Sequence, residues 1–348
     1  MKILQISSCW ARTPPDGFGP AEEVTYDLSV ELAAAGHEVT VFATGDSTVG
    51  LPLAFHFPEV PEYSPANPRK HVEAAVEYAN SHDFDIVHNN ESKHGALLAH
   101  TIRRPTITRA NWLYDADFLQ QFHALDEKAR RATRFVAISH RMRTLLPELS
   151  FAGTVHNGID VDGFPFGADK QDYVLFLGRI IPEKGVDLAI EAARTAGVPL
   201  VIAGQLLDRH RKFFEQKVAP ALDGDQVSWY GPASRTQAKQ LLRDARALLM
   251  PYRWEEPFGK VLVEAQACGT PVVSVPWGAV PEVVADGITG FLRATAEEMA
   301  AAIGQVDRIS PTACRERAVT RFSRGRMAAD YVHLYEKLLV DAGRGSRR

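Results

Sequence analysis

The sequence predicts an α/β protein built from two doubly wound parallel sheets, and three observations carry this prediction. Short apolar runs alternate with segments of helical periodicity along the chain, which is typical of repeated βα units. The alternation restarts after a loop rich in glycine and aspartate, residues 158–172. Near its start the chain shows the order strand, glycine loop, helix and strand, which is in outline a phosphate-binding topology.

The first series runs from Lys2 to Asn157. It opens with an apolar strand, Lys2–Ser7, and continues through a Pro- and Gly-rich loop into a helix over Ala21–Ala35 and a strand over Glu38–Ala43. That helix carries an apolar residue at every fourth position and is followed by a glycine. Further helices are expected over Pro68–Ser81, Gly95–Arg103, Asp117–Ala132 and His140–Leu146, and strands over Ile86–His88, Pro105–Thr108, Phe135–Ser139 and Thr154–Asn157.

The second series begins at Tyr173 with a strand, a loop and a helix. Strands are then expected in LVIAG, VSWYG, ALLMPY, PVVSV and TGFLR, and helices over His210–Val218, Arg235–Ala245 and Arg321–Leu339. We therefore expect an N-terminal domain over residues 1–163, a C-terminal domain over 164–320, and a final helix and tail over 321–348. The two domains should face each other across a cleft, and the final helix should cross back to the first domain.

The composition is that of a globular protein with nearly balanced charge. The chain has 348 residues, of which 45% are hydrophobic, and a formal net charge of −4 at pH 7. This length is enough for two domains with separate cores, and the charge argues against general nucleic-acid binding. Cys9, Cys268 and Cys314 show neither CxxC nor metal-ligand spacing, which favours a reducing compartment.

We expect a cytoplasmic protein without a transmembrane segment. No apolar run approaches about 18 residues, and the opening MKILQISSCW resembles a buried strand rather than a signal peptide. Arg103, Arg104, Arg130 and Arg131 fit either a peripheral contact with an anionic membrane or a solvated helix surface. The oligomeric state is left open.

The stretch WEEPFGKVLVEAQACGTPVV, Trp254–Val273, is the most informative motif. It is expected to be a loop that enters a helix, with Glu256 before the helix and Glu264 about a turn inside it. The start of a helix offers unpaired N–H groups that suit phosphate. Carboxylates there would repel phosphate but accept hydrogen bonds from sugar hydroxyls. The alternative is an ordinary buried helix with a polar entrance.

This stretch is one of several motifs whose order along the chain matches that of a known protein family. The others are GFGPAEE, FVAISH, HNGID, LGRIIPEKGVDLAIEAAR, VIAGQ, WYG and GAVPEVVADGITGF. On these motifs the chain resembles the family 4 glycosyltransferases of the GT-B type, and within them the subgroup of an avilamycin-biosynthesis glycosyltransferase. The resemblance implies retaining transfer of a sugar from a nucleoside-diphosphate donor, UDP or GDP in most cases, to an acceptor hydroxyl. The acceptor would be a glycan, a lipid or a natural-product aglycone.

The resemblance also implies roles for individual residues. Arg179, Lys184 and Glu256 are assigned to the catalytic site, where the two cations would stabilise the leaving diphosphate and Glu256 would bind hydroxyls of the donor sugar. Glu264 would bind the ribose. The remaining donor-binding residues expected are Gly17, Gly19, Asn111, Gly204, Tyr230, Gly231, Pro257, Phe258, Gly259 and Lys260. No metal and no other cofactor are expected, because two cations and two helix starts already offer positive charge.

Two positions depart from the pattern of the family. Lys260 stands where this subgroup usually has an apolar residue, and it could touch phosphate or simply pair with Glu264. Asn111 stands where many relatives have a histidine near the donor sugar; a structural asparagine at a strand end is the alternative. His88 is a second polar candidate, with a structural role equally open.

Three other functions fit the fold class. A nucleotide-sugar 2-epimerase would need no acceptor, and a non-catalytic protein would only bind the nucleotide sugar. A nicotinamide dehydrogenase fits less well, because the first glycine loop lacks the three-glycine spacing. The acceptor pocket is expected to involve the loops 13–20, 51–68 and 111–122, with Trp112, Tyr114 and Phe118 either stacking on the acceptor or packing in the core.

Overall fold

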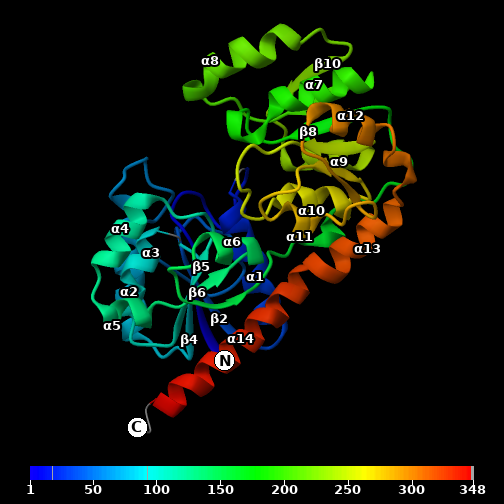
Figure 1. The fold of residues 1–348 in the computed structure, drawn as a ribbon. Helices are drawn as coiled ribbons and strands as arrows, with labels where there is room; N and C mark the ends of the chain where they lie inside the picture. Colours follow the sequence, from blue (N-terminus) through cyan, green and yellow to red (C-terminus); the bar gives the residue numbers. More distant parts are fainter. Residues whose placement is uncertain (18, 92, 346–348) are drawn as a thin grey trace. The chain divides into compact units, whose positions relative to one another are not determined.

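The computed structural model describes residues 1–17, 19–91 and 93–345 and shows two compact units (Figure 1). The first unit comprises Met1–Gly158 together with the chain from Arg324 onward, and the second comprises Ile159–Ser323. The boundaries predicted after residues 163 and 320 lie a few residues from these divisions. Phe18, in the glycine loop expected to approach the donor, lies outside the described residues, as do Ser92 and the last three residues of the tail.

The first unit is built on a seven-stranded sheet with the order β3-β2-β1-β4-β5-β6-β7, and every neighbouring pair is parallel. Its strands are β1 (Lys2–Ile6), β2 (Glu38–Ala43), β3 (Leu53–Phe55), β4 (Ile86–Asn89), β5 (Thr106–Ala110), β6 (Phe135–Ala137) and β7 (Phe151–Thr154). Both faces of such a sheet need a cover, and the residues of β1, β4, β5 and β6 are accordingly almost all buried.

Helices cover both faces of this sheet. They are α1 (Pro20–Ala34), α2 (Asn67–Ser81), α3 (Lys93–Leu98), α4 (Ala116–Ala124), α5 (Glu127–Ala132), α6 (His140–Leu145) and α14 (Arg324–Gly345). Successive residues of β1 point to opposite faces. Ile3 packs in the core made with α1 and α14, whereas Leu4 and Ile6 pack in the core made with α2.

The C-terminal helix α14 returns to the first unit and contacts α1, which confirms that prediction (Figure 1). Its contact with the sheet is polar as well as apolar. The buried Tyr335 hydroxyl lies 2.7 Å from His88 Nδ1 and accepts a hydrogen bond of 3.3 Å from Gln5 Nε2. Burial lowers the pKa of His88 well below its usual value, so the ring is neutral in the folded protein. These contacts fit the structural alternative for His88.

Several details of the first unit differ from the predicted elements. The helix predicted over Asp117–Ala132 is two helices, because the Asp126 side chain accepts from Ala129 N and starts α5 anew. The last strand is Phe151–Thr154 rather than Thr154–Asn157, and β3 was predicted as loop. β3 has only three residues and lies at the sheet edge, so it leaves little periodic signal.

The second unit contains a six-stranded parallel sheet with the order β10-β9-β8-β11-β12-β13. Its strands are β8 (Val174–Leu177), β9 (Leu200–Ala203), β10 (Val227–Gly231), β11 (Ala247–Met250), β12 (Val272–Ser274) and β13 (Gly290–Leu292). The larger helices are α7 (Val186–Ala196), α9 (Arg235–Asp244), α10 (Lys260–Ala267), α12 (Ala296–Ile303) and α13 (Pro311–Phe322), with the short α8 (Arg211–Phe213) and α11 (Val280–Val283). α7 packs against α12, and α10 packs against α9 and α13.

Two helix predictions for the C-terminal half were too simple. The segment predicted as one helix over His210–Val218 is helical but changes type along its length, from a 3₁₀ turn, Asp208–His210, to α8 and then to a π-helical segment, Phe214–Val218. The helix predicted from Arg321 is interrupted at Ser323, where the backbone is extended and α14 begins afresh. Among the described residues, none of the helices combines the length and apolar character that a membrane span requires.

Candidate functional site

Most of the residues predicted to bind the donor belong to the second unit, and the three assigned to the catalytic site follow the carboxyl ends of β8 and β11. These two strands are neighbours although they are far apart in sequence, because the order of the strands reverses between them. Ligands of open α/β sheets bind where the order reverses in this way. The loop after β8 carries Arg179 and Lys184, and the loop after β11 carries Glu256.

Glycines allow the backbone segments at this edge to approach closely. A β-carbon on Gly204, directly after β9, would lie 1.8 Å from the Gly178 carbonyl oxygen. Gly185 has a φ of 73°, and a β-carbon there would lie 2.0 Å from the Pro251 carbonyl oxygen. Both positions therefore require glycine. Because Gly185 directly follows Lys184, this contact brings Lys184 to the end of β11.

Lys184 and Glu256 form a largely buried ion pair. Lys184 Nζ donates to Glu256 Oε2 over 2.6 Å, and the two side chains are only 16% and 10% exposed. Trp254 Nε1 donates to the same oxygen over 3.0 Å. The ammonium of Lys184 also lies 4.7 Å from the ring centroid of Tyr252 and 5.1 Å from that of Trp254. The ion pair was not predicted from the sequence.

Arg179 lies half-buried near this pair. Burial lowers its pKa, and the nearby Arg209 adds to this effect, whereas Glu256 and Glu183 oppose it. A guanidinium stays protonated despite such a shift. The site therefore brings the basic groups of Arg179 and Lys184 close to the carboxylate of Glu256.

The entrance to α10 follows the predicted order. Glu256 precedes the helix, and Gly259 occupies its N-cap with a φ of 80°. Pro257, Phe258 and Gly259 are all buried. The Phe258 side chain packs on Phe322, with ring centroids 5.9 Å apart, so its contribution to a ligand site would come from its backbone.

Glu264 lies in the second turn of α10 and is paired within the helix. Lys260 Nζ lies 3.0 Å from Glu264 Oε1, at side-chain exposures of 13% and 19%. The i,i+4 pairing offered by the sequence is therefore present. Tyr252 is fully buried nearby: burial raises its pKa well above the usual value, and Glu256 and Glu264 add to this rise.

The three residues predicted to contact the nucleotide base also come together. Gly204 N donates to the Gly231 carbonyl over 2.8 Å, which joins the ends of β9 and β10. Gly231 has a φ of 84°, and Tyr230 beside it is 46% exposed. The predicted donor-binding residues of the second unit thus lie along one edge of one sheet.

The remaining three predicted residues belong to the first unit. Gly17 is exposed, and a β-carbon there would meet no atom of the described residues within 4 Å, whereas one on Gly19 would lie 2.8 Å from Pro15 Cβ. Gly19 is the N-cap of α1. Asn111 Nδ2 donates to the Asn90 carbonyl over 2.6 Å. This bond fits the alternative given for Asn111, a structural asparagine at the end of a strand.

The first unit also holds buried charge that the sequence did not reveal. Glu91 follows β4, is 5% exposed, and accepts from Gly95 N over 2.7 Å. Burial raises the pKa of Glu91 to about 7. Arg109 of β5 is 1% exposed and donates to the Ala21 carbonyl over 3.2 Å. The only sequence signal for these residues is their position at or just beyond the ends of neighbouring strands.

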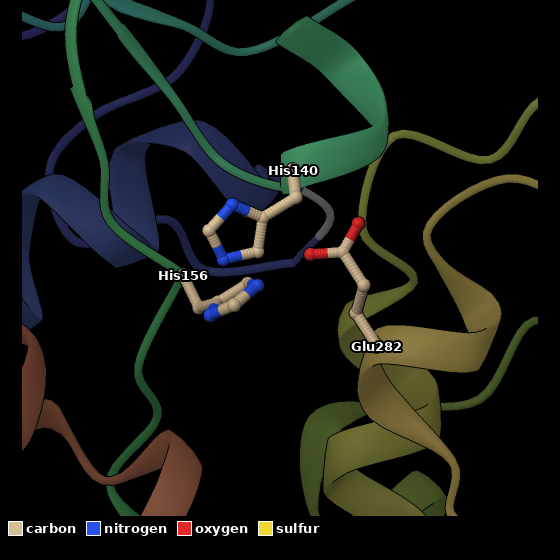
Figure 2. Close-up of side chains that lie close together, drawn as sticks. All are labelled: His140, His156 and Glu282. Carbon is tan, nitrogen blue, oxygen red and sulfur yellow. The ribbon is translucent and has the colours of Figure 1, made fainter. Parts of the chain in front are cut away.

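Two histidines of the first unit lie side by side beyond its sheet. His140 begins α6 and His156 follows β7, and their rings meet edge to face with centroids 5.4 Å apart (Figure 2). Arg326 of α14 donates to the His156 carbonyl over 2.6 Å. The prediction that no metal is required stays a prediction.

The acceptor-loop aromatics divide between core and surface. Tyr114 and Phe118 are buried and stack on each other, with ring centroids 3.9 Å apart, so core packing accounts for both. Trp112 is 41% exposed.

Comparison with known families assigns each half of the chain. Residues 163–318 match the family described as glycosyl transferases group 1, and residues 21–162 match glycosyltransferase family 4. The D-inositol 3-phosphate glycosyltransferase of Mycobacteroides abscessus is 38% identical over 171 residues, which cover 44% of this chain and 38% of that protein. The glycogen synthase of Mycobacterium tuberculosis is 28% identical over 95% of this chain and 91% of its own.

The matched region therefore spans less than half the length of the D-inositol 3-phosphate enzymes, including that of Mycolicibacterium smegmatis, of which it covers 35%. Among solved structures, AviGT4, a glycosyltransferase involved in avilamycin A biosynthesis, matches with a TM-score of 0.73 at 21% identity over 98% of both chains. Anabaena Alr3699/HepE in complex with UDP and glucose matches with a TM-score of 0.74 at 20% identity, over 96% of this chain and 98% of that one. These likenesses show a shared GT-B fold. The chain belongs to the family 4, group 1 glycosyltransferases.

Proposed function

We propose that the protein transfers a sugar from a nucleoside-diphosphate donor to an acceptor hydroxyl with retention of anomeric configuration. The observation that carries this proposal is the convergence of Arg179, Lys184 and Glu256 where the strand order of the second sheet reverses. The start of α10 lies in the same loop as Glu256. Two cations, a helix start and a carboxylate together match a diphosphate joined to a sugar.

The diphosphate gains negative charge as the bond to the sugar breaks, and Arg179 and Lys184 are the groups to stabilise that charge. Lys184 is already bonded to Glu256, but an ammonium has three N–H groups. It therefore binds phosphate oxygens without leaving Glu256. In the absence of donor, Glu256 compensates the positive charge of Lys184 in a largely buried place.

The donor is proposed to be a UDP-sugar. Support comes from the Anabaena protein of the same fold, whose structure contains UDP and glucose. In this reading Glu256 accepts hydrogen bonds from sugar hydroxyls and Glu264 from the ribose, while Gly204, Tyr230 and Gly231 contact the base. A GDP-sugar is the alternative donor. The proposed acceptor is a hydroxyl of a glycan, a lipid or a natural-product aglycone. The similar fold of AviGT4 supports the avilamycin-type subgroup.

The transfer is proposed to proceed on one face of the sugar. The acceptor oxygen bonds to the anomeric carbon as the bond to the diphosphate oxygen breaks, and the acceptor proton passes to the leaving diphosphate. No carboxylate nucleophile enters this route. Mass spectrometry after incubation with a slow fluorinated donor tests it: a glycosyl adduct on the protein would contradict the same-face route.

The function itself is tested with a panel of UDP- and GDP-sugars, each with and without acceptor extracts. We expect acceptor-dependent release of one nucleoside diphosphate and a matching glycoside by mass spectrometry. Conversion of the donor to its 2-epimer without acceptor would favour an epimerase, and binding without turnover a non-catalytic protein. Arg179→Ala is the control for activity from contaminants.

A further inference from the structure

The ion pair of Lys184 and Glu256 is enclosed by aromatic side chains from the loop after β11. The ammonium of Lys184 lies over the Tyr252 ring at 4.7 Å and over the Trp254 ring at 5.1 Å. Both distances are within the range of cation–π attraction, which strengthens as the cation is removed from water. Lys184 is only 16% exposed, so it meets this condition.

Trp254 contacts both members of the pair. Its ring faces the Lys184 cation, and its indole N–H donates to Glu256 Oε2 over 3.0 Å. Lys184 donates to that same oxygen over 2.6 Å. One side chain thus touches the cation through its π-face and the anion through its N–H group. A phenylalanine would keep only the first contact, and an aliphatic residue neither.

The loop that carries these rings is itself anchored to the loop of Lys184. Arg253 N donates to the Glu183 carbonyl over 2.9 Å, and its guanidinium pairs with Asp187 of α7 over 2.9 Å. Trp277 Nε1 donates to the Tyr252 carbonyl over 3.1 Å. The rings are therefore held on a braced backbone, whereas Lys184 has a flexible four-carbon side chain.

We propose that Trp254 is a positioning residue for the transfer reaction, holding the Lys184 ammonium and the Glu256 carboxylate in one arrangement. Tyr252 supplies the second ring of this clamp. The clamp fixes the direction in which Lys184 presents its remaining N–H groups to the leaving diphosphate, and it keeps one oxygen of Glu256 engaged while the other faces the sugar. The catalytic part of this inference rests on the proposed function.

The first test is kinetic and uses Trp254→Leu and Trp254→Phe. Lys184 is expected to act most strongly on the charge that develops in the transition state. Trp254→Leu should therefore lower kcat by roughly 10- to 100-fold while KM changes by less than about threefold. The kcat of Trp254→Phe should lie between those of the wild type and Trp254→Leu, because phenylalanine retains an aromatic ring.

The second test needs no activity. Lysines of the ligand-free protein are acetylated with limiting acetic anhydride, and the labelling of each is followed by peptide mass spectrometry. Release of Lys184 from the clamp in Trp254→Leu should raise its labelling several-fold. Lys239 is the internal reference, because it lies over the Phe164 ring at 4.6 Å in the same unit without any contact to Trp254 among the described residues.

The two tests separate the clamp from the proposed function. Faster labelling of Lys184 together with a fall in kcat supports the proposal. Unchanged labelling in both variants overturns the clamp, and faster labelling with unchanged kcat overturns its role in catalysis. If the wild type turns over no donor, the proposed function fails while labelling still decides whether Trp254 holds Lys184. Should Trp254→Leu not fold, Trp254→Phe carries both measurements.

Discussion

Glu264 and Lys260 form an ion pair across one turn of α10, with 3.0 Å between Oε1 and Nζ. The carboxylate proposed to bind the ribose is therefore already held in one direction by its own helix. An acceptor oriented in advance loses less conformational freedom when a hydroxyl binds. Lys260 is thus proposed to orient Glu264 rather than to bind phosphate directly.

The first prediction separates these two roles by UDP affinity. Glu264→Ala should weaken UDP binding by about tenfold, the size of one or two lost hydrogen bonds. Lys260→Met should weaken it by less than about threefold, because Glu264 keeps its acceptor oxygens. Isothermal titration with UDP measures both. A larger loss for Lys260→Met than for Glu264→Ala would place Lys260 on the phosphate instead.

A second prediction concerns stability. Removing one member of a buried ion pair leaves the other charge without compensation. Lys184→Met or Glu256→Gln alone should each lower the free energy of unfolding of the second unit by about 3 kcal/mol, and the double variant should recover part of that loss. Urea unfolding gives the coupling energy.

The exposed pair Arg69–Glu73, at 65% and 48% side-chain exposure, is the control for that cycle. Its coupling should stay below about 0.5 kcal/mol. Equal coupling energies for the two pairs would show that the pair Lys184–Glu256 is no more buried in solution than a surface pair.

Arg179 is the subject of the third prediction. Arg179→Ala should lower turnover by roughly 10²–10³-fold, the usual effect of losing one group that stabilises developing charge. Arg179→Lys should restore part of the activity, since a point charge remains without the forked geometry. Arg194→Ala, which removes a surface pair with Asp223, is the control and should leave turnover within about twofold.

A fourth prediction follows from the contact of Gly204 with the Gly178 carbonyl. Gly204→Ala would place a β-carbon 1.8 Å from that oxygen, so the two strand ends must separate. We expect the free energy of unfolding to fall by about 3 kcal/mol or more, as measured by thermal unfolding. Gly304→Ala is the matched control: its φ is −65°, and among the described residues its β-carbon would approach only the Ala301 carbonyl oxygen, at 3.5 Å. Similar melting temperatures for the two variants would contradict the close approach.

The fifth prediction uses the buried Glu91. Its folded pKa, about 7, lies above the ordinary value of 4.5. Between these values the unfolded chain loses a proton that the folded protein keeps, so this group lowers stability as pH rises from 4.5 to 7. The free energy of unfolding of Glu91→Gln, taken relative to that of the wild type, should rise by about 1–3 kcal/mol between pH 4.5 and pH 8. Glu62→Gln, an exposed substitution, is the control; a gain of the same size there would refute the burial effect.

Local pattern was enough to predict most of the fold, because parallel strands and their helices leave strong periodic signals. It failed where tertiary context decides, as at Asp126 and Ser323, where a cap or an extended residue divides a helical pattern. The order of the strands within each sheet had to come from the structure.

For the site, the motif and the resemblance pointed to Arg179, Lys184, Glu256 and Glu264, and the structure places all four at one sheet edge or its following helix. Their roles remain predictions. What could not be foreseen is which charges pair, since Lys184 and Glu256 are distant in sequence. The role proposed for Trp254 was hidden for the same reason, although the residue begins the motif itself.

The return of α14 has a consequence for how the protein is made. The second unit is one continuous stretch, Ile159–Ser323, whereas the first needs Met327, Tyr331 and Tyr335 to complete its core. On the ribosome, those residues emerge only after the whole second unit has been synthesised. The half of the protein that is translated first is therefore the half that finishes folding last, and until then α1 covers that side of its sheet without α14.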